Sequence, residues 1–263
     1  MEQKPLPDFR AARTDAGVIL SKNGNRLKLM EGIAVCLLSV FLSVVLAELF
    51  QSVVGLATEK ESILFFADVA VFCFSALFQL FFTLPLFAGL LGMAAGMARG
   101  EAVLLTDLFE PFSGKSSYRR ALGLVVRPFL FTVGMILAVR WTAGIFGAVG
   151  GAFWVAFLAA VVIVAEVILW LRILARGFFA ALFVCFCGMP AVDAWWKNDR
   201  MAGTAKRGGT VWLLCNLPWI LLGLLTVGIL LLADVFPRMC VSYFLYAGRM
   251  TDAVNSSEGT NHE

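Results

Sequence analysis

The sequence predicts an all-α protein, a polytopic transmembrane helix bundle with about six spans arranged as three hairpins. Hydrophobic residues make up 60% of the 263 residues, and mean hydropathy is +0.88. Soluble domains do not reach this apolar content. Of the 21 Lys and Arg residues, 17 lie in three polar stretches, 4–28, 99–127 and 172–207. Basic segments between apolar spans stay in the cytoplasm, so this distribution predicts how the chain is oriented.

Three regions are expected along the chain. Residues 1–30 are mostly polar and form a cytoplasmic N-terminal tail, and residues 31–250 form the transmembrane domain. Residues 251–263 are rich in Ser, Asn, Thr and Glu and form a disordered C-terminal tail. The start of the chain lacks the order of a signal peptide, so the first span is expected to be retained. The predicted location is the plasma membrane, with the N-terminus in the cytoplasm.

The first hairpin is expected to join a span at 33–57 to a span at 63–97, since a spanning helix needs about 20 mostly apolar residues. One face of the first span is small and polar and should pack on another helix. The residues of that face are Cys36, Ser39, Ser43, Ala47 and Gln51. The second span is long and contains Pro85, which predicts a kink or break there.

Glycines follow this proline at four-residue steps. Gly92, Gly96 and Gly100 predict a groove where another helix can approach closely. Gly100 also predicts the end of the helix. Asp107, with an acid three residues on at Glu110, predicts the start of a short helix in the cytoplasmic connection. Its apolar side is expected to lie at the membrane surface.

The second hairpin is predicted from a span at 121–141, a Gly-rich outer turn at 142–151 and a span at 153–187. A basic segment with two tryptophans follows at 193–207 and is expected to be cytoplasmic. The third hairpin begins with a span at 210–233.

The return of the third hairpin is less defined. An outer turn is expected around Asp234 and Pro237. The apolar stretch 239–250 is short, and it is expected either to cross the membrane as a tilted sixth span or to lie at its surface.

Several stretches together resemble an uncharacterised group of bacterial integral membrane proteins with five or six spans, of the domain-of-unknown-function 975 type. The stretches that carry the resemblance are Leu84–Gly92, Ala98–Glu101, Thr106–Phe109, Leu217–Gly228, Pro237 and Tyr243–Tyr246. The most specific element is the Arg-Gly-Glu segment followed by Asp-Leu-Phe. The group has no settled activity, so the resemblance implies the fold and supplies no mechanism.

Ionisable residues inside spans are costly and are therefore candidates for function. Glu166 lies well inside the fourth predicted span, where it is either an ion, proton or substrate contact or a carboxylate satisfied within the bundle. Glu48 and Asp68 lie nearer the outer ends of their spans, where both side chains can reach the interface.

The cytoplasmic connection carries a second set of candidates. Arg99, Glu101, Asp107 and Phe109 form either a docking site for a cytoplasmic partner or a helix stop followed by the start of an interfacial helix. The segment Ser113–Ser116 has only part of a phosphate-binding loop, since Phe109 stands where that loop needs glycine. Nucleotide binding is therefore rejected.

Catalytic and cofactor chemistry has little support in the sequence. The single histidine is His262, and the six cysteines lie in or beside apolar runs, so no metal or other cofactor is predicted. The first hypothesis is a non-enzymatic accessory or assembly component that contacts membrane lipids and another membrane protein or a second copy. Alternatives are a small transporter or channel subunit that uses Glu166, and a membrane enzyme acting on lipid. No nucleic acid partner is expected, because the basic residues accompany the spans.

Overall fold

The computed structural model describes residues 7–57, 61–148, 157–158, 160–166, 168–169, 177–225 and 231–259. Every regular element in these ranges is a helix, which confirms the predicted all-α class. The elements are α1 (Phe9–Ser21), α2 (Asn25–Ala57), α3 (Glu61–Phe78), η1 (Gln79–Thr83), α4 (Leu84–Ala98), η2 (Leu105–Phe112), α5 (Lys115–Ala148), η3 (Leu182–Phe186), α7 (Ala191–Arg200), α8 (Ala202–Leu225), η4 (Leu231–Val235) and α9 (Phe236–Gly259).

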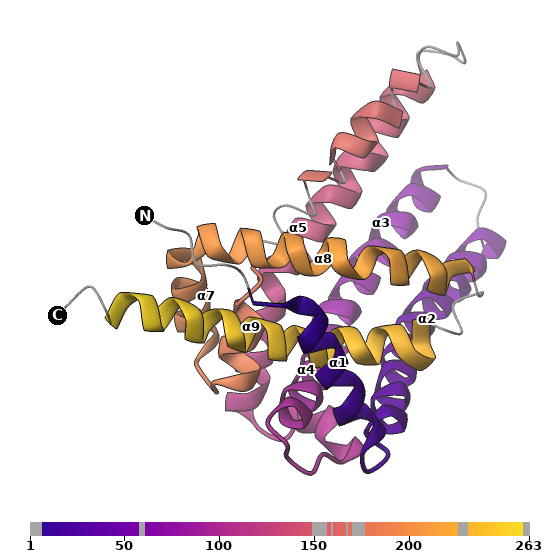
Figure 1. Cartoon of the computed structure of the whole chain (residues 1–263). Coiled ribbons are helices and arrows are strands. Elements are labelled where there is room, and N and C mark those ends of the chain that lie inside the picture. The colour runs from indigo at the N-terminus through magenta and orange to yellow at the C-terminus, as the bar shows by residue number, and fades with distance from the viewer. Residues whose placement is uncertain are drawn as a thin grey trace.

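The helices pack into a body at one end of the molecule, from which two pairs of long segments extend (Figure 1). α4 lies at the centre of this body and contacts α2, α5, α9, η2 and η3. Its side chains Leu86, Met93 and Met97 are fully buried, as are Phe244 and Tyr246 of α9. Beyond the body, α5 extends away from the other labelled helices (Figure 1).

Three helical stretches among the described residues are long and apolar enough to cross a bilayer. They are Asn25–Leu56, Phe66–Ala98 and Lys115–Phe146. In an apolar 18-residue window of each stretch, no more than 22% of the residues are buried within the molecule, as expected of helix segments that face lipid. The predicted fourth and fifth spans fall partly outside the described residues.

The small polar face predicted on the first span is buried at three of its five residues, whereas Ala47 is half-buried and Gln51 is exposed. Cys36, Ser39 and Ser43 are buried against neighbouring helices, and the Ser39 and Thr83 hydroxyls lie 3.2 Å apart. Small residues let two helices approach closely, and the hydroxyl contact links them where apolar burial supplies little driving force.

The predicted break near Pro85 is also present. The helix widens into the π-helical turn η1 immediately before this proline. Pro85 has no N–H to donate to the carbonyl of Phe81, four residues earlier. The Tyr118 hydroxyl of α5 donates to that carbonyl at 2.8 Å. The disruption caused by the proline therefore provides a hydrogen bond between two helices.

The described part of the N-terminal segment is helical and packed from Phe9 on, which differs from the tail predicted for residues 1–30. Residues 9–21 form α1, with the Asp8 side chain accepting from the Arg10 N–H at 2.8 Å at its start. The residues that α1 buries are Phe9, Ala12, Ala16 and Leu20. Their spacing of three and four places them on one helix face, and α1 packs with that face on α9.

The C-terminal segment corrects the sequence prediction as well. α9 continues to Gly259, so the part of the 251–263 tail that is described is helical instead of disordered. The Thr251 hydroxyl donates to the carbonyls of Ala247 and Gly248 at 3.0 and 2.7 Å. Two residues earlier, Arg249 pairs with Asp15 of α1. The stretch 239–250 is a core helix of the body.

The connection after α4 begins as predicted and then differs. Gly100 has φ +80°, and the Glu101 N–H donates to the Gly96 carbonyl at 3.0 Å, which ends α4 in a Schellman motif. The next helix, η2, starts at Leu105, two residues before the predicted start. Asp107 therefore lies inside its first turn, where its carboxylate accepts from the Leu104 N–H at 2.8 Å.

Two predicted turns are placed differently by the structure. α5 continues through Ala148, so the outer turn expected from residue 142 is helical over its described part. Asp234 was expected in an outer turn. Its carboxylate instead lies 2.9 Å from the guanidinium of Arg26, which belongs to the first turn of α2. α8 and α9 run across the direction of α2, α3 and α5 (Figure 1). The predicted arrangement of about six spans as three hairpins is not confirmed by the described helices.

Candidate functional site

A cavity of about 540 Å³ opens where the connection between α4 and α5 meets the end of α4. Its walls come from α4, the segment 101–103, η2, the start of α5, the end of η3 and the two residues after η3. Its apolar wall is made of Ala88, Gly89, Gly92, Met93, Gly96, Val103, Pro111, Ala121, Leu124 and Val184. Its charged residues are Arg99, Glu101, Asp107, Glu110 and Arg120. The cavity thus joins the glycine segment and the Arg-Gly-Glu…Asp segment singled out in the sequence.

Two of the predicted glycines, Gly92 and Gly96, line this cavity. A Cβ at Gly92 would meet nothing within 4 Å, so this position leaves open space. A Cβ at Gly96 would lie 3.0 Å from the Val103 side chain and 3.1 Å from a Glu101 carboxylate oxygen. The close approach of another helix occurs at Gly89, where a Cβ would overlap the Leu108 carbonyl oxygen of η2.

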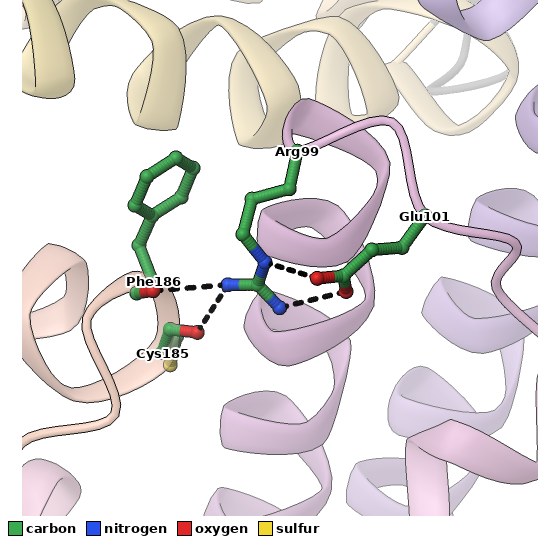
Figure 2. Close-up of polar contacts among 4 residues, drawn as sticks. All are labelled: Arg99, Glu101, Cys185 and Phe186. Atoms are coloured by element: carbon green, nitrogen blue, oxygen red, sulfur yellow. Dashed lines mark hydrogen bonds and ion pairs between the residues drawn. The ribbon is translucent and has the colours of Figure 1, made fainter.

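Arg99 holds two walls of the cavity together (Figure 2). Its Nε and Nη2 donate to the two carboxylate oxygens of Glu101 at 2.6 and 2.8 Å. Its Nη1 donates to the carbonyls of Cys185 and Phe186 at 3.0 and 3.1 Å. These carbonyls lie at the end of η3, where a cation is favourable because the helix exposes unpaired carbonyl groups. A residue 86 positions further along the chain is thereby fixed to the end of α4.

The Arg99–Glu101 pair also changes the acid–base behaviour of both groups. The hydrogen bond from Arg99 lowers the pKa of the Glu101 carboxyl below its ordinary value. The same bond raises the pKa of the Arg99 guanidinium. Both groups therefore stay charged near neutral pH, and neither is suited to exchange a proton during a reaction.

The other charged residues of the cavity are used mainly to position the backbone. Asp107 caps the start of η2, and a Glu110 carboxylate oxygen accepts from the Ser117 hydroxyl at 2.8 Å. Arg120 contributes positive charge at the rim and forms no ion pair within the described part of the chain. Phe109 lies on the outer side of η2 with its ring 47% exposed. The predicted docking set is therefore split between the cavity and the outer surface of η2.

The chemistry of the cavity favours binding. An apolar wall beside charges of both signs suits a ligand segment that is apolar on one side and polar on the other. Among the described residues, no three His, Cys, Asp or Glu side chains form a group able to hold a metal ion. The carboxylates of Glu101, Asp107 and Glu110 each accept a hydrogen bond from a neighbouring group of the protein.

Glu166 lies in a second, smaller hollow of about 260 Å³ on the extended α5 segment. Its Oε1 accepts from the Thr142 hydroxyl at 2.9 Å, whereas its Oε2 is buried without a hydrogen-bond partner in the described structure. The remaining lining is apolar and is made of Leu130, Phe131, Gly134, Met135, Ala138 and Leu169. A buried carboxylate oxygen without a donor costs several kcal/mol if the group is charged, so Glu166 is incompletely satisfied.

Glu48 and Asp68 lie apart from both hollows. Asp68 accepts from the Gln51 amide at 2.8 Å, which links α2 to α3. Glu48 is exposed on α2, where its backbone carbonyl accepts from the Ser52 hydroxyl. Glu48, Asp68 and Glu166, the three candidates predicted inside spans, therefore do not share a site.

Two parts of the cavity were not identified from the sequence. The wall formed by residues 184–188 comes from a segment far along the chain and carries no motif. Gly89 was not singled out, although it precedes the predicted glycine series by three residues. Its signal is weak because a glycine among apolar residues in a spanning segment is common.

No protein-family model, curated protein or solved structure matches this chain. The resemblance to the uncharacterised bacterial membrane group stays a prediction.

Proposed function

We propose that this protein is a multi-pass component of the plasma membrane without catalytic activity of its own. In this role it binds a segment of another membrane protein in the cavity beside Arg99. The observation that carries the proposal is that polar groups of the cavity are fixed by hydrogen bonds within the protein. Arg99 is held by one carboxylate and two carbonyls, and Asp107 caps a helix. Such a preorganised surface binds a partner with little ordering cost.

The shape of the cavity indicates what kind of segment fits. Its floor is the glycine face of α4, and Gly92 leaves room for a side chain from outside. Its rim carries charge, so the fitting segment has an apolar side chain followed closely by polar groups. The end of a transmembrane helix, where the chain leaves the lipid, has this composition.

The proposal is tested by a larger side chain that occupies part of the cavity. Gly92→Leu adds a side chain where a Cβ meets nothing within 4 Å. Gly55→Leu is the matched control, because a Cβ at Gly55 in α2 also meets nothing within 4 Å and the residue lies outside the cavity. A photoreactive residue in place of Ala102 on the rim should cross-link a membrane protein in cells. We expect Gly92→Leu to abolish this product and Gly55→Leu to keep it.

Two results would overturn the proposal. A cross-linked product of equal yield in Gly92→Leu would show that the cavity is not the binding surface. Complete absence of a product from the rim, with the purified protein monomeric after gentle extraction, would remove the partner. A product of twice the chain mass would identify the partner as a second copy.

Glu166 favours a second candidate function, a small transporter or channel subunit. Its unpartnered Oε2 beside an apolar hollow is the kind of site that takes up a proton or a cation inside a membrane. Flux of protons or small cations into proteoliposomes should then fall when Glu166→Gln is introduced. Unchanged flux would exclude Glu166 from transport, and no flux above empty vesicles would exclude this class for those ions.

A further inference from the structure

A second cluster of charges lies on the side of the body where α1, α2, α8 and η4 meet. Arg26 and Arg238 both contact the same oxygen of Asp234, each at 2.9 Å. Arg13 donates to the Asn216 amide oxygen at 2.9 Å. Its guanidinium also lies 4.3 Å above the Trp219 ring.

The charges of this cluster do not balance. Three guanidinium groups face one carboxylate, which leaves a net charge of +2 (three positive charges against one negative). Among the described ion pairs, Arg26 and Arg238 share Asp234, and Arg13 has only a neutral amide and a ring as partners. Burial, followed by the repulsion of Arg238, lowers the pKa of Arg13, while Asp234 opposes this effect. The cluster would therefore be stabilised by an additional anion.

The groups are positioned to meet such an anion. The side chains of Arg26 and Arg238 are 47% and 36% exposed, so they are reachable from outside. Arg26 belongs to the first turn of α2, the first helix long and apolar enough to span. Arg and Trp side chains at the end of a spanning helix lie at the level of the lipid headgroups.

We propose that Arg13, Arg26 and Arg238 bind the phosphate of an anionic phospholipid at the cytoplasmic face of the membrane. A guanidinium group can donate two parallel hydrogen bonds to the oxygens of one phosphate, which an ammonium group cannot do with the same geometry. Basic pockets between helices on the cytoplasmic side recognise anionic headgroups in this way. The site does not depend on the cavity beside Arg99, which lies among other elements.

The test compares lipid nanodiscs of phosphatidylcholine with discs that also contain phosphatidylglycerol. Thermal unfolding and the number of retained lipids, measured by native mass spectrometry, are the two readouts. We expect phosphatidylglycerol to raise the unfolding temperature of the wild-type protein and to be retained. Arg13→Gln combined with Arg238→Gln should weaken retention by about tenfold or more, since each loses charge-assisted hydrogen bonds. In phosphatidylcholine alone this variant should be as stable as wild type, because repulsion is relieved.

The matched control is Arg200→Gln on α7. The Arg200 guanidinium also lies over a tryptophan ring, 5.2 Å from Trp196, but it belongs to no cluster around an acid. Arg13→Lys keeps the charge and loses the paired geometry, so we expect intermediate retention. This variant also tests the site if the double variant does not fold.

Separate arms distinguish a lipid from a free anion. Inorganic phosphate and glycerol phosphate, added to phosphatidylcholine discs, should give a small rise in unfolding temperature that salt suppresses. A rise in unfolding temperature as large as that given by phosphatidylglycerol would show that the site binds a soluble phosphate, and it would overturn the proposal of a lipid ligand. Equal loss of retention in Arg200→Gln and the double variant would also overturn the proposal, because it would reveal unspecific attraction to positive charge.

Discussion

Replacing Gly89 by alanine should detach η2 from α4. A Cβ at this position would overlap the Leu108 carbonyl oxygen and lie 2.9 Å from its carbonyl carbon. It would also lie 3.2 Å from the Pro111 side chain. A flexible side chain can move aside from an added methyl group, but here the obstacle is backbone. The whole helix η2 must therefore shift, and with it the outer wall of the cavity.

The size of the effect follows from a matched pair within one helix. Gly92 lies three residues further along α4, and a Cβ there meets nothing within 4 Å. Both replacements gain the same helix propensity of about 1 kcal/mol, which cancels in the comparison. The remaining difference is the free-energy cost of the steric overlap at Gly89. Because the overlap is with backbone atoms, this cost should be at the upper end of the range seen for overpacked cores. Gly89→Ala should therefore be less stable than Gly92→Ala by about 3 kcal/mol.

Unfolding in mixed micelles with increasing dodecyl sulfate measures this difference through tryptophan fluorescence. Limited proteolysis between residues 99 and 114 should also become faster in Gly89→Ala and stay unchanged in Gly92→Ala. Equal stability and equal proteolysis of the two variants would show that η2 does not pack on α4 through Leu108. The description of the cavity wall would then be wrong.

Three further predictions test other contacts. Tyr118→Phe removes the donor to the carbonyl that the proline of α4 leaves free, and it should destabilise the protein by about 1 kcal/mol in the same micelle assay. The hydrogen bond from Arg99 lowers the pKa of Glu101 in the folded protein, so the pair stabilises the protein above about pH 4.5, and this contribution is lost as pH falls through the folded pKa. Glu101→Gln should therefore reduce the fall of the unfolding temperature at acid pH. An unchanged fall would contradict the pairing. In a background without native cysteines, Lys115→Cys and Asp234→Cys should both resist an impermeant thiol reagent added to intact cells, and labelling of either from outside would contradict the proposed orientation.

The parts of the fold that could be predicted are those specified by local pattern. Long apolar runs indicated the helices of the three candidate spans, and the serine and cysteine spacing indicated which face of α2 is buried. The stop at Gly100 followed from the same local chemistry. α1 was missed for a physical reason. It has only 13 residues and carries Arg10, Arg13 and Asp15, so it does not resemble a span, although its buried residues are spaced as on one helix face.

The candidate site was predictable only where its contacts are local. Arg99 and Glu101 are two residues apart, and their pairing agrees with a helix stop followed by a turn. The carbonyls of Cys185 and Phe186 complete the same group of hydrogen bonds from 86 and 87 residues away. Backbone carbonyls are present at every position, so no residue pattern marks the two that Arg99 contacts. This long-range contact joins the segment 184–188 to the end of α4, so that wall of the cavity could not be predicted from the sequence.

The third hairpin shows why counting basic residues can misplace a segment. The orientation rule depends on Lys and Arg, whereas acidic residues contribute little, so a turn containing Asp234 was assigned to the outside. In the structure this carboxylate lies 2.9 Å from Arg26, at the start of α2. The hydrocarbon core of a bilayer is about 30 Å thick, so groups in an ion pair must be on the same side of it. If α2 starts in the cytoplasm, Asp234 is cytoplasmic too. The sequence also predicts that the segment 193–207, which leads into α8, is cytoplasmic. If both predictions hold, an outer turn at Asp234 is excluded, and α8 would not be a simple span from inside to outside.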